Sequence, residues 1–374
     1  MDEQDRRNSF DLLRLFAAFC VFFGHQIVFH GHPEMLLGLS RISLASIGLY
    51  IFFALSGYLV AQSLVRAPQP SRYFRARALR IFPGAAVNVA FCVLLGACIT
   101  TLAPASYFSA WQTWKFAFHN TAIVIPPTQL ALPGVLENAR WPVVNGSIWT
   151  LKYELLCYLL LFALFWIARL CRLPLRPFMA VCAAIAVASY IAVRTFLPLP
   201  QGDAFFTGYT AFNTSRFVMT FLAGAFVAAF EPKDDRSRLL LFVLPAILVV
   251  AGPTPEFARA GVILLLTLLV IEIGRRPFFH SRLYSRIGDL SYGTFLYAYP
   301  IQNTLVTRYY DGTNGISVTL AALGLTLVCA LLSWHVVEKP ALKLKRPATQ
   351  PLRSSSAAAQ KTAEDRSRTG SRTP

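Results

Sequence analysis

The sequence predicts an all-α membrane protein, a polytopic helical bundle of about ten transmembrane helices. Hydrophobic residues make up 55% of the 374 residues and charged residues only 14%, about half the charged share of an ordinary soluble domain. The apolar residues also recur in blocks of roughly twenty along almost the whole chain, which matches the thickness of a bilayer core. These observations favour one continuous helical domain over several soluble ones.

Windows of about nineteen residues place the helices in order along the chain. The predicted spans cover 10–30, 44–65, 79–101, 148–169, 177–196, 214–231, 238–252, 257–274, 288–308 and 316–337. The seventh is the shortest, because Pro253 and Pro255 leave it near the lower length limit for crossing a bilayer. If it did not cross, the topology of the later spans would be inverted.

Residues 10–345 are expected to form one transmembrane domain between two polar ends. Residues 1–9 are expected to be a cytoplasmic N-terminus. The first span contains Arg14 and His25 and is followed by no small-residue cleavage site, so it is expected to be a retained helix and not a signal peptide. Residues 346–374 are mostly Ser, Ala, Thr, Arg and Pro without apolar periodicity, which predicts a disordered cytoplasmic tail.

The positions of lysine and arginine predict the orientation. With the N-terminus inside, fifteen of these residues fall on the cytoplasmic side: Arg66, Arg72, Arg75, Arg77, Arg80, Arg169, Arg172, Arg176, Lys233, Arg236, Arg238, Arg275, Arg276, Arg282 and Arg286. Six fall outside: Arg41, Lys115, Arg140, Arg194, Arg259 and Arg308. This excess supports an even number of spans with both termini cytoplasmic. It also accounts for much of the net charge of +17, and no basic stripe indicates a nucleic-acid partner.

The longest outer connection, about 102–147, is rich in proline and aromatic residues. Its mixed polarity favours an ordered lid or an interfacial segment that faces an acceptor. The seven cysteines lie within or at the ends of apolar blocks without a Cys-x-x-Cys pair. They are expected to act as small hydrophobic residues, and neither as disulfides nor as zinc ligands.

Ionisable groups inside the hydrocarbon region are costly and usually face an interior cavity, so they mark candidate sites. Arg14 and His25 lie eleven residues apart in the first span. This spacing puts both on one helix face, about 16 Å apart along the axis, with the arginine near the inner surface. Each also has a structural interpretation: His25 as a hydrogen-bonded bundle histidine, and Arg14 as a side chain that reaches the membrane edge.

Glu154 is the candidate carboxylate of the fourth span, which runs from outside to inside in this topology. Thr150, Glu154 and Tyr158 recur every fourth residue and form a polar stripe on an apolar helix. Glu154 is expected one or two turns from the outer end, at a depth similar to that of His25. A carboxylate near an imidazole orients it for base catalysis. The structural alternative is an interfacial pair with Lys152.

Residues 73–83 contain an arginine cluster, Arg75, Arg77 and Arg80, at the inner end of the third span. Clustered guanidinium groups and helix-terminal amides suit a polyphosphorylated ligand, although positive-inside bias or anionic lipids account for such a cluster equally well. Glu338, after the last span, is expected to pair with a nearby arginine. The sequence contains no Gly-rich phosphate loop, His-x-x-x-His pair or Gly-x-Ser-x-Gly elbow, so no metal is expected.

Six short strings, taken in order, resemble the acyltransferase 3 family of integral membrane acyltransferases. The strings are Phe10-Asp11-Leu12-Leu13-Arg14-Leu15-Phe16-Ala17 with Gly24-His25, Phe53-Ala54-Leu55-Ser56-Gly57-Tyr58-Leu59, Arg75-Ala76-Arg77 with Arg80-Ile81-Phe82-Pro83, Trp149-Thr150-Leu151 with Glu154, Leu290-Ser291-Tyr292-Gly293, and Val337-Glu338-Lys339-Pro340. Single strings are weak signals, whereas six in one order, over about 8–346, are specific.

The resemblance implies a ten-helix enzyme that transfers an acyl group, usually acetyl, from cytoplasmic acyl-coenzyme A to a carbohydrate hydroxyl at or beyond the membrane. It implies a multi-pass protein of the bacterial inner membrane, in contact with its lipids. It also implies essential roles for Arg14 and His25, and links Arg75 and Arg77 to the donor, acetyl-CoA. Many relatives carry histidine where this chain has Ala298, so no accessory histidine role is expected there.

The expected function is therefore carbohydrate O-acetylation of an exported or cell-surface glycan. His25 would be the general base, Glu154 its orienting carboxylate and Arg14 electrostatic support, while Arg75, Arg77 and Arg80 would hold coenzyme A. Direct transfer and an acetylated His25 are both open. The alternatives are a secondary transporter or flippase for a lipid-linked sugar, and a glycosyltransferase with Glu137 as its base.

Overall fold

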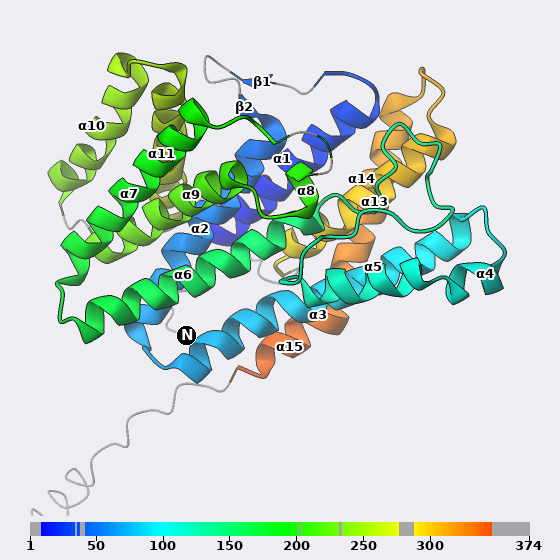
Figure 1. Ribbon diagram of the computed structural model, residues 1–374, viewed down its shortest axis with the longest axis horizontal. Helices are drawn as coiled ribbons and strands as arrows, with labels where there is room; N and C mark the ends of the chain where they lie inside the picture. Colours follow the sequence, from blue (N-terminus) through cyan, green and yellow to red (C-terminus); the bar gives the residue numbers. More distant parts are fainter. Residues whose placement is uncertain are drawn as a thin grey trace, which may run out of the picture.

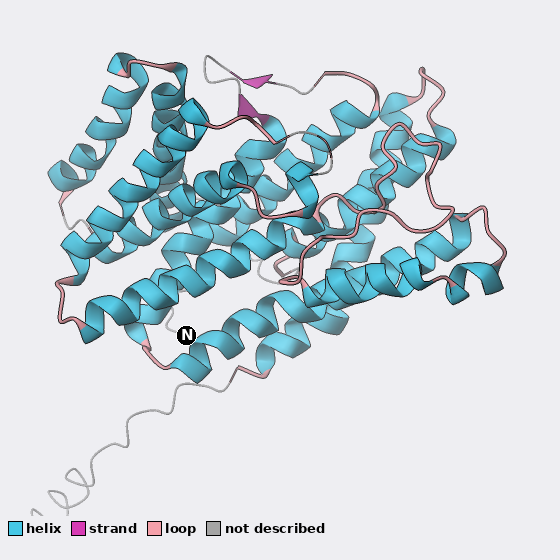
Figure 2. Cartoon of the chain, in the orientation of Figure 1, coloured by secondary structure: helices cyan, strands magenta, loops and turns pink. Residues whose placement is uncertain are grey.

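The computed structural model describes residues 9–33, 36–37, 42–200, 202, 204–231, 234–276 and 288–345. Helices dominate the described chain, with one two-stranded antiparallel pairing between Leu36–Leu37 and Ile42–Ser43 (Figure 2). The expected tail, 346–374, and most of the expected N-terminus lie outside these residues. The described part of the chain confirms the all-α polytopic class.

The ten predicted spans correspond to ten long helices, and short elements connect several of them (Figure 1). The long helices are α1 (Phe10–Phe29), α2 (Leu44–Arg66), α3 (Pro70–Ile99), α6 (Leu151–Leu170), α7 (Leu175–Phe196), α9 (Ala211–Phe230), α10 (Asp235–Ala251), α11 (Pro255–Arg275), α13 (Ser291–Tyr309) and α14 (Gly315–Ser333). The short elements are β1 (Leu36–Leu37), β2 (Ile42–Ser43), α4 (Pro104–Ser109), α5 (Trp111–Ala122), the 3₁₀ turn η2 (Ile148–Thr150), α8 (Ala204–Thr207), the π-helical turn η3 (Trp334–Glu338) and α15 (Lys339–Lys343).

Eight helices within the described residues are long and apolar enough to cross a membrane. Helices α10 and α13 are not among them. The first has only 17 residues, as its flanking prolines predicted. Helix α13 is more polar, and its residues from Ser291 to Thr304 are all buried inside the bundle. Neighbouring elements satisfy several of its polar groups, such as the Gln302 and Asn303 amides. Large apolar side chains cover the outside instead, among them Val250 and Phe196, which are 86% and 80% exposed.

The centre of the bundle depends on close helix contacts at small residues. Helices α1 and α2 lie between the α9–α11 group and the α13–α14 pair (Figure 1). A Cβ atom at Gly57 of α2 would collide with the carbonyl oxygen of Phe221 in α9, and one at Gly224 would collide with that of Ala54. These glycines let the two backbones touch, as small residues do between membrane helices. Gly57 therefore serves helix packing.

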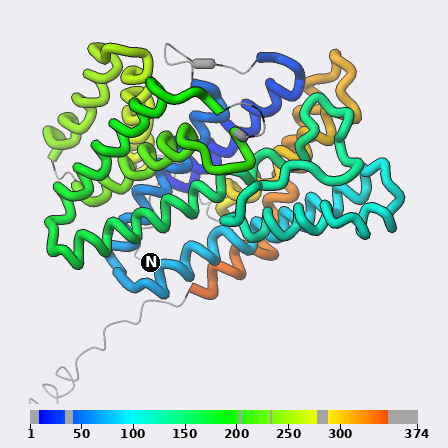
Figure 3. The backbone as a smooth tube through the Cα atoms, in the orientation of Figure 1, coloured from blue at the N-terminus to red at the C-terminus, as the bar shows by residue number. Residues whose placement is uncertain are grey.

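The segment between α3 and α6 folds back into the bundle. Helix α5 packs along α3 (Figure 3), exposing Trp111, Trp114 and Phe118 on its outer face. Asn145 then donates through Nδ2 to Asn88 Oδ1 at 2.9 Å and to the Leu296 carbonyl at 3.1 Å. Because Asn88 lies eleven residues before the end of α3, the segment reaches about 16 Å below that end. Helix α6 consequently begins inside the bundle.

Candidate active site

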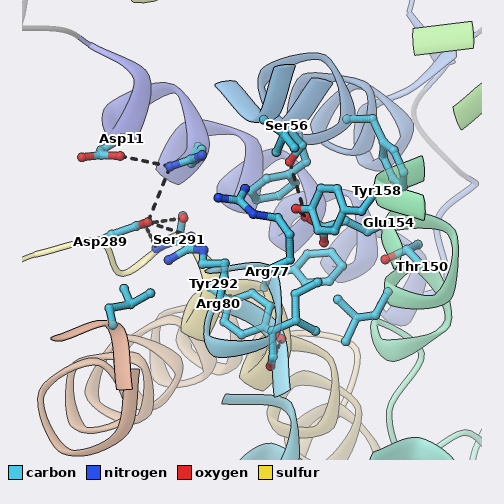
Figure 4. Close-up of a pocket in the computed structure, with 18 of the residues that line it drawn as sticks. Asp11, Ser56, Arg77, Arg80, Thr150, Glu154, Tyr158, Asp289, Ser291 and Tyr292 are labelled. Atoms are coloured by element: carbon cyan, nitrogen blue, oxygen red, sulfur yellow. Dashed lines mark hydrogen bonds and ion pairs between the residues drawn. The ribbon is translucent and has the colours of Figure 1, made fainter. Parts of the chain in front are cut away.

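A cavity of about 410 Å³ lies between α1, α2, α3, α6 and α13 (Figure 4), and Trp334, Leu342 and Lys345 also line it. Its volume is in the range of small-molecule sites. Charged groups from α1, α3, the turn before α13 and Lys345, which follows α15, line one part of it. Apolar residues such as Phe52, Phe53 and Val60 form the wall on α2. A ligand with an anionic head and a slender, less polar arm would match this division.

Ion pairs fix the polar end of the cavity. Asp289 lies in the turn before α13. Its Oδ2 accepts a hydrogen bond from Arg80 Nη2 at 2.7 Å and lies 3.9 Å from Arg14 Nη1. Arg14 also pairs with Asp11 at 3.2 Å, one helical turn away. The Asp289 side chain is only 9% exposed, and a buried carboxylate needs such partners to stay ionised. The predicted Arg14 and Arg80 are thus brought together by an aspartate that the sequence interpretation did not single out.

Two further cations at this end have no carboxylate partner among the described residues. Arg77 stacks its guanidinium over the Tyr158 ring, 5.6 Å from the centroid, and its Nε is buried without a hydrogen-bond acceptor. Lys345 lines the same cavity from beyond α15. An unsatisfied buried donor is costly unless a ligand completes it. Arg77 and Lys345 therefore leave positive charge available to an anionic ligand.

Glu154 lies in the cavity within a cluster of hydroxyl groups. Its Oε1 accepts hydrogen bonds from Ser56 Oγ at 3.3 Å and from the Tyr158 hydroxyl (Figure 4). Thr150, one turn earlier, lines the cavity as well, so the predicted polar stripe of α6 does face an interior site. The interfacial alternative fails, because Lys152 is buried and donates to the Phe206 carbonyl at 2.7 Å.

His25 does not line this cavity. Its ring makes edge-on contacts with Tyr299 at 5.1 Å and packs near Phe29 at 6.2 Å between ring centroids, and its Nδ1 is buried without a partner. The cavity comes close to it, however. Ala45 contacts Gly24, which precedes His25, and Tyr299 contacts the His25 ring. Leu49 lies four residues after Ala45, Phe295 lies four residues before Tyr299, and both line the cavity. This offset is one helical turn, about 6 Å.

The expected pairing of Glu154 with His25 is not formed, and the expected common depth was wrong. Ala45 packs against Gly24 beside His25, whereas Glu154 is hydrogen-bonded to Ser56, eleven residues further along α2. The two groups are therefore about 16 Å apart along that helix. Glu154 lies nearer the level of Arg14. The cause is the infolded segment before α6, which starts this helix deep in the bundle instead of at its outer end.

The remaining predicted positions have other surroundings. Arg75 is exposed and does not line the cavity. Glu338 is 3% exposed and accepts from Ser333 Oγ at 2.9 Å in the π-helical turn, a geometry often found near functional sites. Glu137 accepts the Gly134 amide at 2.9 Å, a local turn contact. No group of three or more His, Cys, Asp or Glu suited to a metal occurs within the described ranges.

Three charged lining residues were missed from the sequence: Asp11, Asp289 and Lys345. Asp11 and Asp289 had a usable signal, since Asp11 follows Phe10 in a recognisable string and Asp289 directly precedes the Leu290-Ser291 string. Each is also an acidic residue near the start of a predicted span, Asp11 in the first and Asp289 in the ninth. Lys345 had none, because only the packing of α15 against α3 brings it to the cavity.

The helical bundle and its hydropathy define a multi-pass membrane protein with a charged cavity in its interior. A family model described as an acyltransferase domain matches residues 7–335, so the chain belongs to the acyltransferase 3 family and is a membrane acyltransferase. Nodulation protein 10 of Rhizobium leguminosarum bv. viciae is 28% identical over 366 residues, covering 91% of this chain and 94% of that protein. An O-acetyl transferase of Shigella phage Sf6 is 27% identical over 362 residues, covering 91% and 98%. No solved structure matches.

Proposed function

We propose that this protein is a carbohydrate O-acetyltransferase of the bacterial inner membrane. It takes an acetyl group from cytoplasmic acetyl-CoA and places it on a hydroxyl group of an exported or cell-surface glycan. The observation that supports this most is the cavity in which Arg77 and Lys345 lack carboxylate partners within the described part of the chain. In the orientation predicted from lysine and arginine, with both termini cytoplasmic, this charged end faces the cytoplasm.

The residues of the cavity suit coenzyme A as the donor. Arg77, Arg80 and Lys345 would contact its phosphates, because guanidinium and ammonium groups form strong charge-assisted bonds to phosphate oxygens. Arg75, which is exposed on the same helix, would attract the donor from outside the cavity. The pantetheine arm would follow the Phe52 and Phe53 wall. The thioester would then lie about one helical turn from His25.

His25 would act on the acceptor hydroxyl as a general base. Its imidazole takes the hydroxyl proton while the oxygen attacks the thioester carbonyl; the new C–O bond forms, the C–S bond breaks, and the thiolate leaves and takes up the proton. The unpartnered Nδ1 keeps one ring nitrogen available. In the two-step variant, an imidazole nitrogen of His25 attacks the thioester carbonyl; the N–C bond forms, the C–S bond breaks, and the thiolate leaves with the imidazole proton. The sugar oxygen then attacks the acetyl-histidine, the C–O bond forms as the N–C bond breaks, and the hydroxyl proton returns to the imidazole.

Arg14 and Glu154 would act on the donor side of the reaction. Both lie at the level of the charged cavity, and Arg14 is held by Asp11 and Asp289. Glu154 positions the Ser56 and Tyr158 hydroxyls, and Tyr158 in turn supports the Arg77 guanidinium. In this proposal Glu154 is a positioning residue for the donor, and it does not orient His25.

Acetyl-CoA should stabilise the purified protein in lipid nanodiscs against thermal unfolding. At a concentration of about 100 times Kd, a ligand that binds only the folded state adds about 2.7 kcal/mol. Acetyl-CoA lacking the 3′-phosphate should stabilise it less, because one anionic contact is removed. A transporter for lipid-linked sugar would instead be stabilised by the sugar lipid and not by acetyl-CoA, and that result would contradict the proposal.

Donor binding should weaken as the pH rises through about 8. Burial and the nearby guanidinium groups of Arg77, Arg80 and Arg14 lower the pKa of Lys345 to about 8. The ammonium is charged below this pH and loses its proton above it, so the cavity loses one positive charge. A bound polyanion moves the midpoint upward in the complex. Measuring acetyl-CoA affinity from about pH 7 to 9 for wild type and Lys345→Gln tests this; an unchanged slope in the variant would assign the titration elsewhere.

A further inference from the structure

A second cavity, of about 390 Å³, lies at the opposite end of α1 from Arg14. It is open to the outside and is bordered by the residues that follow α1, the turn between α13 and α14, and the first turns of α14. In the predicted orientation this end of α1 faces outward. Because α1 rises about 1.5 Å per residue, His30 in this cavity lies about 8 Å further toward the outer face than His25.

One wall of this outer cavity consists of polar residues without a carboxylate, Lys or Arg, and the other wall is apolar. His30 stacks on Tyr310, with 4.5 Å between ring centroids and 27° between planes, and the hydroxyl-bearing Thr313 lies beside them. None of its lining residues, all within the described chain, is Asp, Glu, Lys or Arg. Ile316 and Leu320 complete the lining and are 80% and 61% exposed, as expected of side chains that contact lipid.

Hydrogen bonds hold the outer cavity in shape. In the turn before α14, Asp311 Oδ1 accepts from the Thr313 amide and hydroxyl, each at 2.8 Å, and from the Asn314 amide at 3.0 Å. On the α1 side, Gln26 lies 3.0 Å from His30 Nε2 and accepts from Gln302 Nε2 at 2.7 Å. A site that exists before its ligand arrives loses less conformational entropy on binding.

We propose that the outer cavity binds a neutral sugar unit of a membrane-anchored glycan, which is the acceptor. This inference rests on the proposed function. Imidazole and hydroxyl groups pair with sugar hydroxyls, and the lack of a lining cation disfavours a phosphate or carboxylate ligand. The exposed Ile316 and Leu320 lie where the lipid portion of the glycan would pass. Binding energy from this sugar unit would position a neighbouring unit at the reaction centre.

Photolabelling of the full chain in nanodiscs tests this binding without requiring catalysis. The probe is a glycolipid with a single glucosyl headgroup that carries a diazirine. Label is expected on peptides covering residues 310–320, and it should fall about tenfold in Gly315→Leu, where a Cβ would lie 3.4 Å from His30 and 3.5 Å from Tyr310. The matched control is Gly324→Leu on the same helix, where a Cβ meets no atom within 4 Å.

His32→Ala removes an exposed lining group and should also reduce the label, which keeps the test decisive if Gly315→Leu folds poorly. Equal labelling of wild type, Gly315→Leu and His32→Ala would overturn the proposal. So would competition by phosphatidylglycerol as effective as that by unlabelled glycolipid, since the cavity would then be a general lipid contact. If the labelling follows the prediction but the protein does not consume acetyl-CoA, the proposed function is refuted and the proposed sugar site stands.

Discussion

His25→Ala should reduce acetyl transfer by about 10²- to 10⁴-fold, the contribution typical of general base catalysis. The variant removes the imidazole but leaves the helix intact, because alanine favours helices and His25 makes no hydrogen bond within the described chain that its loss would break. Transfer is measured as label moved from acetyl-CoA to a glycan acceptor by protein in nanodiscs. Donor binding, measured by thermal stabilisation, should stay at the wild-type level.

The matched control for this variant is His119→Ala, which changes a histidine of α5 that lies outside both cavities. It should transfer acetyl groups at the wild-type rate. Glycan acetylation retained by His25→Ala would remove the imidazole from the mechanism. The chemistry would then have to lie with the Ser56, Tyr158 and Glu154 cluster inside the donor cavity.

Arg77→Gln should weaken acetyl-CoA binding by roughly 10- to 150-fold. A hydrogen bond to a charged group contributes about 1.5–3 kcal/mol, and each 1.4 kcal/mol corresponds to tenfold in affinity. Glutamine is polar like arginine, but its side chain is shorter and uncharged. The effect should appear in the Kd for acetyl-CoA and in its KM, with a much smaller change in kcat, because Arg77 lies far from the acceptor side.

Arg75→Gln and Arg72→Gln provide the comparison on the same helix. Both arginines are exposed and line no cavity, so each substitution should change the Kd only a few-fold, and less at high salt. A larger effect of Arg75→Gln than of Arg77→Gln would mean that the donor binds on the outer surface of α3. The cavity would then lose its proposed role.

Periodicity and hydropathy were sufficient to predict the helices. All ten predicted spans correspond to helices. The seventh was predicted to be short because of Pro253 and Pro255, and the corresponding helix has only 17 residues. Helix α13 was predicted from its length but is too polar to be one of the eight membrane-crossing candidates. Several of its polar groups are satisfied by tertiary contacts, such as Gln302 donating to the Phe22 carbonyl at 2.9 Å, which no sequence window detects.

The depth of each site residue was harder to predict than its helix. Counting from the expected outer end put Glu154 beside His25, whereas the buried Asn145 bonds to Asn88 draw the start of α6 inward. Arg14, Arg77, Arg80 and Glu154 nevertheless line one cavity. Intramembrane charge is costly wherever it lies, so such residues can be selected from the sequence. Their partners depend on long-range packing and cannot.

The most direct test is to incubate the protein in nanodiscs with acetyl-CoA labelled in its acetyl group, add a glycolipid acceptor, and measure free coenzyme A together with the position of the label. A donor cavity ending one helical turn from His25 predicts thioester consumption that depends on both Arg77 and His25, with label on the glycan or on His25 itself. Intact acetyl-CoA in a sample that binds or moves the glycolipid would contradict the account.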